Sequence, residues 1–357
     1  MKPQCKITID GKLVSGVFME RLKSCRITDA EGVASDSVSI ELNDFPPAAI
    51  PRKGAVIRVW MGYSASSLAF MGSYTADEVE VSMLPYSMKI TGKGADLRMK
   101  SKGAKERHWD DKTLGDIIEQ IAGENGLSAK VDGALASFKI PWIAQEAESD
   151  IHLIERLAQR HNALFSIKDD KLVFAEKGAG KNAGGVALSG VVATPDNIVV
   201  GTARVRFSDR GEYKKVKARY YDREAAENKF VEEDSSDEGG TDYIIGDPFT
   251  DEDEAKAAAK ATAKELKREA ITASVTMLGD PNVRGGAPFS FSGVRADVDG
   301  IPLIIENANH DFSKSGYTVS VTAKLQGQGK SKSGSKPTKR AAATNDASLL
   351  PAHPTLG

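Results

Sequence analysis

Residues 145–165 read QEAESDIHLIERLAQRHNALF, and this stretch combines a helix with the start of a hairpin. Apolar residues recur at positions i, i+3, i+6 and i+7 from Ile151, which places them on one face of a helix. Ser149 can accept a hydrogen bond from a free first-turn amide, and Asp150 lies at the positive end of the helix dipole. Two strands are expected next, at 163–167 and 172–174. The stretch therefore predicts a compact helix-plus-hairpin unit onto which the flanking parts of the chain pack.

The composition is that of an ordinary globular protein, with 40% hydrophobic and 27% charged residues in a chain of 357. That length allows two or three domains, each with its own core. Neither a run of about 18 apolar residues nor a signal-peptide core is present, so no membrane span is expected. The net charge of -2 argues against general nucleic-acid affinity. Cys5 and Cys25 are expected to be buried, reduced thiols in strands.

Short strands separated by turn residues dominate the chain up to residue 92, and they predict a closed or nearly closed antiparallel sheet. An amphipathic helix is expected at 113–124, where Thr113 caps its start and Asn125 lies at its end. Pro141 makes 138–143 an edge strand at best. The expected strands of the first part lie at 5–9, 13–19, 22–28, 36–42, 55–60, 68–71, 79–83 and 86–91.

The second half of the chain alternates strands with one strong helix at 250–268. Thr250 is expected to cap this helix, whose alanine-rich face predicts a thin helix that lies close to a neighbour. The acidic, serine-rich segment 232–238 is expected to be a solvated loop, and the polar tail from residue 326 to be disordered in isolation. The expected strands lie at 197–207, 213–221, 270–277, 288–291, 301–307 and 317–325.

The best candidate for acid/base chemistry is the carboxylate cluster Glu146, Glu148 and Asp150. Paired carboxylates can hydrolyse a glycosidic bond when one of them has a raised pKa. Helix capping is the favoured interpretation, because no cleft sequence rich in Trp or Tyr accompanies the cluster. His108 and His310 lack a nearby nucleophile motif, and no metal or phosphate-binding motif fits its context. No catalytic, cofactor-binding or metal-binding residue is therefore predicted.

Basic residues concentrate at 93–107. A phosphate-contacting patch is one interpretation of this segment. A solvated linker or subunit contact is favoured, because no aromatic residues are interleaved as stacking platforms.

Seven residues of the opening stretch resemble the Q-x-x-E-S-D … R-L-A signature of the phage late control D family. Further pieces resemble the family in the same order, from about residue 6 to residue 325. Asn162 departs from the small residue usual there, but asparagine tolerates the left-handed conformation. The seven residues are Gln145, Glu148, Ser149, Asp150, Arg156, Leu157 and Ala158, and the family resemblance implies that they are a structural motif.

The resemblance implies a mainly β, α+β fold with two β-barrel-like hub domains and an inserted helix-plus-hairpin α/β module. Related hubs occur in tailocins and in type VI secretion spikes. The implied parts are a first barrel at 1–100, the α/β module at 101–190, a second barrel at 191–222 and 285–325, an insert with the alanine-rich helix at 223–284, and a flexible tail at 326–357.

The implied function is that of a structural baseplate hub in a contractile phage tail or tailocin, without enzymatic activity. Three copies would form a ring that adapts the six-fold tail tube to the three-fold spike. The implied partners are the chain itself as a homotrimer, the trimeric spike, tube and baseplate proteins, and the tape-measure protein, without cofactor, membrane span or specific nucleic acid. The protein would be located in the virion tail after assembly in the host cytoplasm. A tail-associated cell-wall hydrolase and a nucleic-acid-binding late regulator are the alternative functions.

Overall fold

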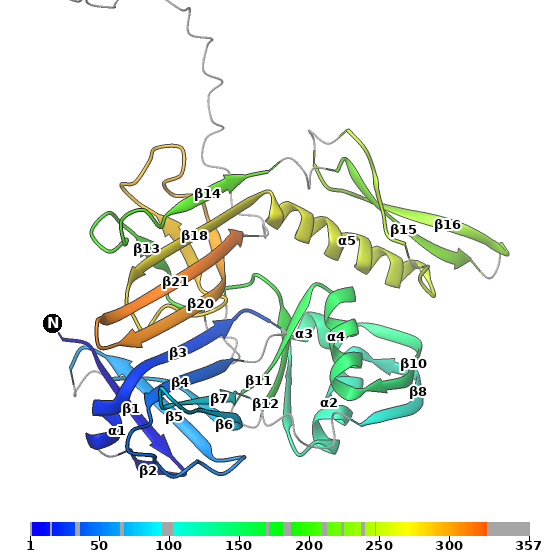
Figure 1. Cartoon of the computed structure of the whole chain (residues 1–357). Coiled ribbons are helices and arrows are strands. Elements are labelled where there is room, and N and C mark those ends of the chain that lie inside the picture. The colour runs from blue at the N-terminus through cyan, green and yellow to red at the C-terminus, as the bar shows by residue number, and fades with distance from the viewer. Residues whose placement is uncertain are drawn as a thin grey trace, which may run out of the picture. The chain divides into compact units, whose positions relative to one another are not determined.

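A computed structural model shows a chain built mainly from antiparallel sheets, as expected for the α+β, mainly β class (Figure 1). Its described residues are 2–14, 16–32, 36–64, 68–94, 103–168, 171–180, 187–208, 213–222, 225–236, 240–246 and 248–326. The expected flexible tail lies outside them, apart from Gln326. No helix among these residues is long and apolar enough to cross a membrane.

The N-terminal half of the large sheet has the strand order β3-β4-β7-β6-β5-β1-β2. Alternate side chains point into one apolar core, where Ile27, Ile40, Val59 and Ile90 are fully buried. The hydrogen-bonded order is an open path, so the ladder itself does not close into a barrel among the described residues. The strands are β1 (Gln4–Ile9), β2 (Lys12–Leu13), β3 (Leu22–Ala30), β4 (Ser37–Asn43), β5 (Val56–Gly62), β6 (Ala69–Ser82) and β7 (Ser87–Lys93).

Two expectations for this half are wrong. Of the strand predicted at 13–19, only Leu13 lies in a strand, because helix α1 (Gly16–Arg21) follows. Phe18 and Met19 are neighbours that both pack on the same core, which a strand cannot achieve because it turns successive side chains to opposite faces. The strands predicted at 68–71 and 79–83 are the two ends of the single strand β6.

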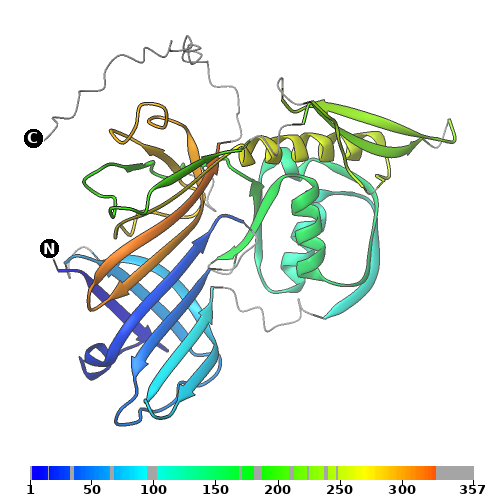
Figure 2. The same ribbon diagram turned by 45° about the horizontal axis from the view of Figure 1, so that its top comes forward.

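The C-terminal half continues the same sheet, because β20 pairs with β3 from Asn307 opposite Ala30 to Ser313 opposite Ser24 (Figure 2). Arg284 reinforces the junction by donating hydrogen bonds to the carbonyls of Phe70 and Met71. This half has its own apolar core. Its strands are β13 (Val191–Ala193), β14 (Arg204–Phe207), β18 (Ile271–Leu278), β19 (Pro288–Phe291), β20 (Leu303–Ser313) and β21 (Gly316–Leu325).

The α/β module confirms the predicted helices and hairpin. Thr113 and Asp116 form a reciprocal capping box at the start of α2 (Leu114–Glu124). Asn162 follows the end of α4 (Asp150–Arg160) and has a φ of 47°, in the left-handed region expected for it. The remaining elements are β8 (Ala104–Thr113), β9 (Ser128–Val131), α3 (Gly133–Ala136), β10 (Lys139–Ser149), β11 (Ala163–Lys168) and β12 (Lys171–Glu176).

The strand expected at 213–221 lies in a separate small sheet and not beside the other strands of the C-terminal half. This strand, β15 (Lys215–Asp222), pairs with β16 (Glu227–Asp234) and β17 (Tyr243–Ile244). Helix α5 (Glu252–Glu269) covers one face of the sheet. Its buried alanines pack against β15, as the alanine-rich face predicted. The strand expected at 270–277 is β18 of the large sheet.

Two local predictions in this region are wrong. Asp251 caps α5 by accepting a hydrogen bond from Glu254 N, whereas Thr250 donates its hydroxyl to the Glu254 carboxylate. The acidic segment predicted as a loop is partly strand, because Glu232 lies in β16. There Lys215 and Lys217 of β15 neutralise its charge.

Candidate functional site

The motif Gln145 to Asp150 begins with a bulge in β10. The pairing of β10 with β8 shifts register between Gln145 and Glu148, and Ala147 has a positive φ of 48°. The Gln145 side chain is fully buried and donates from Nε2 to the Glu148 carbonyl at 2.9 Å. The two residues between glutamine and glutamate are therefore the bulge, and the Gln145 amide closes it.

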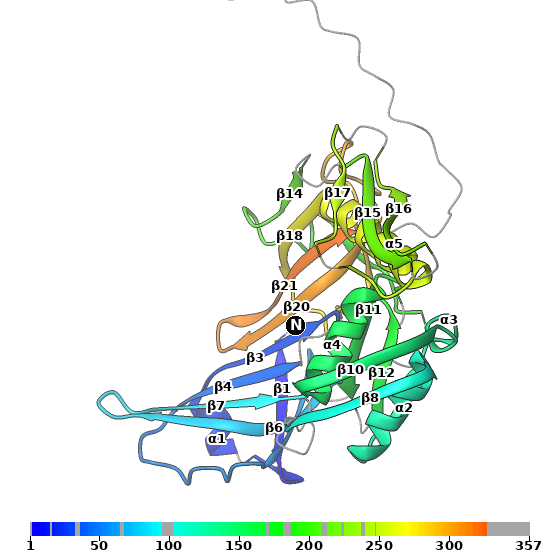
Figure 3. The ribbon, with the colours of Figure 1, turned by 90° about the vertical axis from the view of Figure 1, so that its right-hand side faces the viewer.

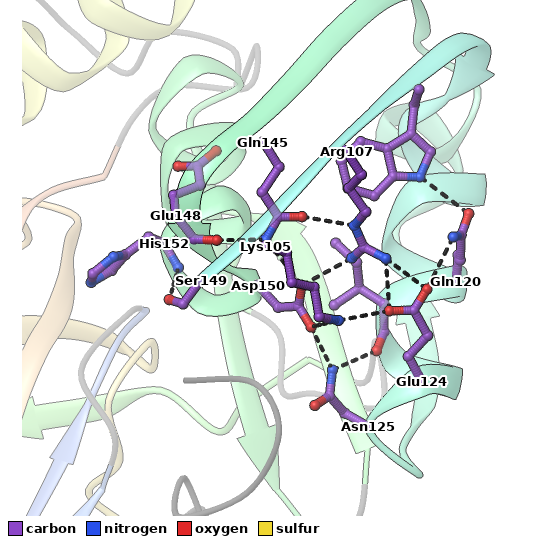
Figure 4. A network of polar contacts seen from close by, with 12 residues as sticks. Lys105, Arg107, Gln120, Glu124, Asn125, Gln145, Glu148, Ser149, Asp150 and His152 are labelled. Atoms are coloured by element: carbon purple, nitrogen blue, oxygen red, sulfur yellow. Dashed lines mark hydrogen bonds and ion pairs between the residues drawn. The ribbon is translucent and has the colours of Figure 1, made fainter. Parts of the chain in front are cut away.

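Asp150 is the centre of the site and is fully buried (Figure 4). Its Oδ1 accepts from Arg107 Nη2 at 2.9 Å and Gln145 Nε2 at 3.1 Å. Its Oδ2 accepts from Lys105 Nζ at 2.7 Å and Asn125 Nδ2 at 3.0 Å. The donors come from β8, from the end of α2 and from β10, so one carboxylate joins three elements to the start of α4.

Glu124 completes the charge balance, because one carboxylate cannot neutralise two cations. It accepts from Lys105 Nζ at 2.8 Å and from Arg107 Nη1 at 2.7 Å. Burial would raise the pKa of Glu124, but hydrogen bonds from Lys105, Arg107 and Gln120 lower this pKa to about 2. Burial likewise opposes ionisation of Asp150, whose pKa nevertheless lies below its usual value because its donors outweigh desolvation. Both groups are carboxylates at neutral pH.

Lys105 and Arg107 belong to the basic segment 93–107, and their interpretation as a solvated linker is wrong. Both lie in β8 with part-buried side chains directed at Asp150. Residues 95–102 of that segment lie outside the described residues. The sequence held one signal for this arrangement: Lys105, Arg107 and Trp109 alternate as the residues of one strand face do.

The other motif residues fasten α4 to β10 and to the core. Arg156 donates to the Ala144 carbonyl at 2.8 Å and pairs with the Glu148 carboxylate. Ser149 accepts from His152 N at 3.3 Å, which confirms the predicted cap. Leu157 and Ala158 are buried in the core of the module.

The three carboxylates considered for hydrolysis do not converge. A cavity of about 380 Å³ is lined by Glu146 and Glu148, but Asp150 is not among its lining residues. The lowered pKa of Asp150 is also the opposite of what a general acid needs. The cavity is further lined by Trp142, Ile143, Ala144, Arg156, Arg160 and Thr250.

The two histidines considered in the sequence lie in different strands, His108 in β8 and His310 in β20. His310 is buried, with its ring nitrogens bonded to Tyr317 Oη at 2.8 Å and to the Val283 carbonyl at 2.9 Å. Burial, together with the Arg284 charge, lowers the pKa of His310 to about 4, so the ring is neutral at pH 7. The described residues contain no cluster of three His, Cys, Asp or Glu side chains that could hold a metal ion.

Comparisons with known proteins agree with the resemblance noted in the sequence. Residues 33–316 match a family model described as phage tail baseplate hub (GPD). The chain is 26% identical to the probable baseplate hub protein of Escherichia phage 186, over 91% of this chain and 94% of that protein.

Solved structures show the same fold at low identity. The 43 kDa tail protein of prophage MuSo2 from Shewanella oneidensis superposes with a TM-score of 0.66 at 16% identity, over 90% of this chain and 98% of that one. The E. coli protein c3393, a type VI secretion component described as similar to the T4 tail proteins gp27 and gp5, gives a TM-score of 0.56. It is 11% identical, over 90% of this chain and 76% of that one.

Proposed function

The chain belongs to the phage tail baseplate hub family, and from this premise we propose that three copies form a ring joining the six-fold tail tube to the three-fold spike. The observation that carries the proposal is the family match over residues 33–316, together with the division of the large sheet into two halves. Each half has its own apolar core. Three copies with two such halves each would offer six comparable positions around an axis.

The ends of the large sheet support assembly into a closed ring. Among the described residues, no strand pairs with the outer edge of β14 or with that of β2. Exposed edges promote association unless they are paired or covered. A head-to-tail contact that closes after three copies would leave no surface for further growth.

The motif around Asp150 has a structural role in this account. The side chains of Lys105, Arg107, Gln145 and Asp150 lock β8, β10, α2 and α4 together, and none of these four residues lines the cavity. The module would therefore act as a rigid body attached to the ring, without enzymatic activity. We assign the first hub domain to 1–100, the α/β module to 101–190 and the tail to 326–357. The second hub domain then comprises β13, β14 and β18 to β21, and the insert comprises β15 to β17 with α5.

The partners in this account are the trimeric spike, the tail-tube and baseplate proteins, and the tape-measure protein. Assembly would take place in the host cytoplasm, before the hub becomes part of a phage or tailocin tail.

The test is the light-scattering mass of the protein alone and after co-expression with its spike protein. A complex of three hub chains that carries the spike is expected, even if the free protein is monomeric. A monomer in both conditions, with no spike co-purified, would contradict the ring.

A further inference from the structure

One exposed surface with the character of an interface is the outer face of the small sheet β16-β15-β17. The opposite face of this sheet is covered, because Val216, Ala218 and Tyr220 pack with the alanines of α5. Along β15, Lys217, Arg219 and Tyr221 alternate with those buried residues and therefore share the outer face. The register places Phe230 opposite Arg219 and Ile244 opposite Lys217.

This aromatic sheet face, formed by Arg219, Tyr221, Phe230 and Ile244, is both apolar and uncompensated in charge. Tyr221, Phe230 and Ile244 are 47%, 52% and 60% exposed. Arg219 forms no ion pair or side-chain hydrogen bond with the described residues, whereas Lys217 beside it is held by Glu232 and Asp242. Aromatic residues and arginine are the types enriched at the centres of protein interfaces.

The second surface is the tip of the β6–β7 hairpin, which extends past the neighbouring strands in Figure 3. Met83 and Leu84 at its turn are 76% and 82% exposed, and Val81 is exposed next to them. Glu78 and Glu80 lie exposed on the same strand, and neither forms an ion pair within the described part of the chain. This hairpin tip, residues 78–84, therefore combines bare apolar side chains with two exposed carboxylates, of which Glu80 lies across the ladder from Lys89.

The two surfaces complement each other. Each exposes large apolar side chains close to charged ones, which is the composition of many protein interfaces. One carries an unpaired arginine and the other exposed glutamates, so their contact would bury apolar area and also pair the charges. Because both surfaces belong to every copy, the fitting partner is a second copy of this chain.

We propose that the hairpin tip of one copy docks on the aromatic sheet face of the next, with Glu78 or Glu80 paired to Arg219. The inference rests on the proposed ring and identifies one contact within it. The two surfaces differ, so the contact is heterologous, and three such contacts close a trimer. Met83 and Leu84 lie against Phe230 and Ile244, and Tyr221 forms the polar margin.

Charge reversal tests the pairing. Arg219→Glu should weaken association of the hub chains, measured after co-expression with the spike, at least about tenfold, because a like-charge contact replaces an attractive one. Glu78→Arg combined with Glu80→Arg should do the same, and joining all three reversals should restore association to within about threefold of the wild type. Arg58→Glu, which reverses an exposed charge on β5, is the matched control and should change nothing. Weakening without rescue in the combined variant would overturn the pairing.

Disulfide trapping tests the geometry directly. Leu84→Cys and Phe230→Cys in one chain should give a covalent trimer with oxidised glutathione. A mixture of the two single variants should stop at dimers, and either variant alone should give none. A dimer from one single variant, or no trapping by the double variant although the wild type is trimeric, would overturn this contact and leave the ring intact. A wild type that stays monomeric even with its spike would overturn both.

Discussion

Two buried carboxylates hold this chain together in different ways. Asp150 accepts four hydrogen bonds from donors within one module, at most 45 residues away in sequence. Glu31 accepts from Arg268 Nη2 at 2.8 Å, across 237 residues, and from the backbone amide of Gly178 at 2.7 Å. The side chains of Arg268 and Glu31 are only 1% and 2% exposed.

The difference lies in how much compensation each charge has. The Asp150 site contains two cations and a second carboxylate, Glu124, so removing one group leaves the others paired. The Glu31 carboxylate has one cationic partner in the described part of the chain, Arg268. The Nε and Nη1 atoms of Arg268 have no hydrogen-bond partner among the described residues, although Nη1 lies 3.7 Å from Glu265 Oε2. In the local network the remaining charges therefore compensate the loss of one group. In the long-range pair the described residues offer no second cation that can compensate the buried Glu31 carboxylate.

Removing the long-range cation should have the largest effect. Arg268→Ala leaves the Glu31 carboxylate buried without its cation and should lower the free energy of unfolding by about 3–5 kcal/mol. Urea unfolding measures this change. Lys256→Ala is the control on the same helix, since its exposed pair with Glu252 should contribute less than about 1 kcal/mol. Equal losses of unfolding free energy in the two variants would show that the buried pair contributes no more stability than the exposed one.

Neutralising the local carboxylate should cost less. Asp150→Asn keeps the shape and one acceptor oxygen, and Glu124 still faces both cations, so a loss of about 2 kcal/mol is expected. The measurement is again the free energy of unfolding in urea. A loss of stability as large as that of Arg268→Ala would show that Glu124 does not compensate for the missing Asp150 charge.

Acid should weaken the same network within a defined range. The folded pKa of Glu124 is about 2 and lies below its unfolded value, so the folded chain binds fewer protons between pH 4.5 and pH 2. The stability that Glu124 contributes is present above this range and is lost as pH falls through it. The urea midpoint of wild type should therefore fall more steeply there than that of Glu124→Gln. Parallel curves would exclude this contribution.

The smallest effect is expected at Glu148. Glu148→Gln keeps the bulge, because Gln145 bonds the backbone carbonyl of Glu148 and not its side chain. Tail assembly and infectivity should stay at the wild-type level in a plaque assay of phage carrying the variant. Loss of infectivity with normal folding and assembly would instead indicate a chemical role for this carboxylate.

The two carboxylate sites also show what the sequence could predict. The cap at Ser149, the helix face through Leu157 and the turn at Asn162 are local signals, and each is confirmed. The role of Lys105 depends on pairing between β8 and β10, which no local pattern encodes. The partner of Glu31 lies even farther along the chain, so only the folded structure identifies Arg268.

The strands show the same limit. Alternation located most of them, but it could not assign β15 to the small sheet or show that β20 pairs with β3. Both facts depend on which apolar faces find each other after folding. Within α1, local alternation gave the wrong element because packing of Phe18 and Met19 on one core decided it.

The proposed three-chain ring can be tested by counting the copies of this chain at the tail tip. A cryo-electron microscopy reconstruction of the tail end, made without imposed symmetry, would count the copies between tube and spike. We expect three copies, with the N-terminal and C-terminal sheet halves alternating around the axis. Six copies, a single copy, or a ring in which only one half faces the axis would contradict it.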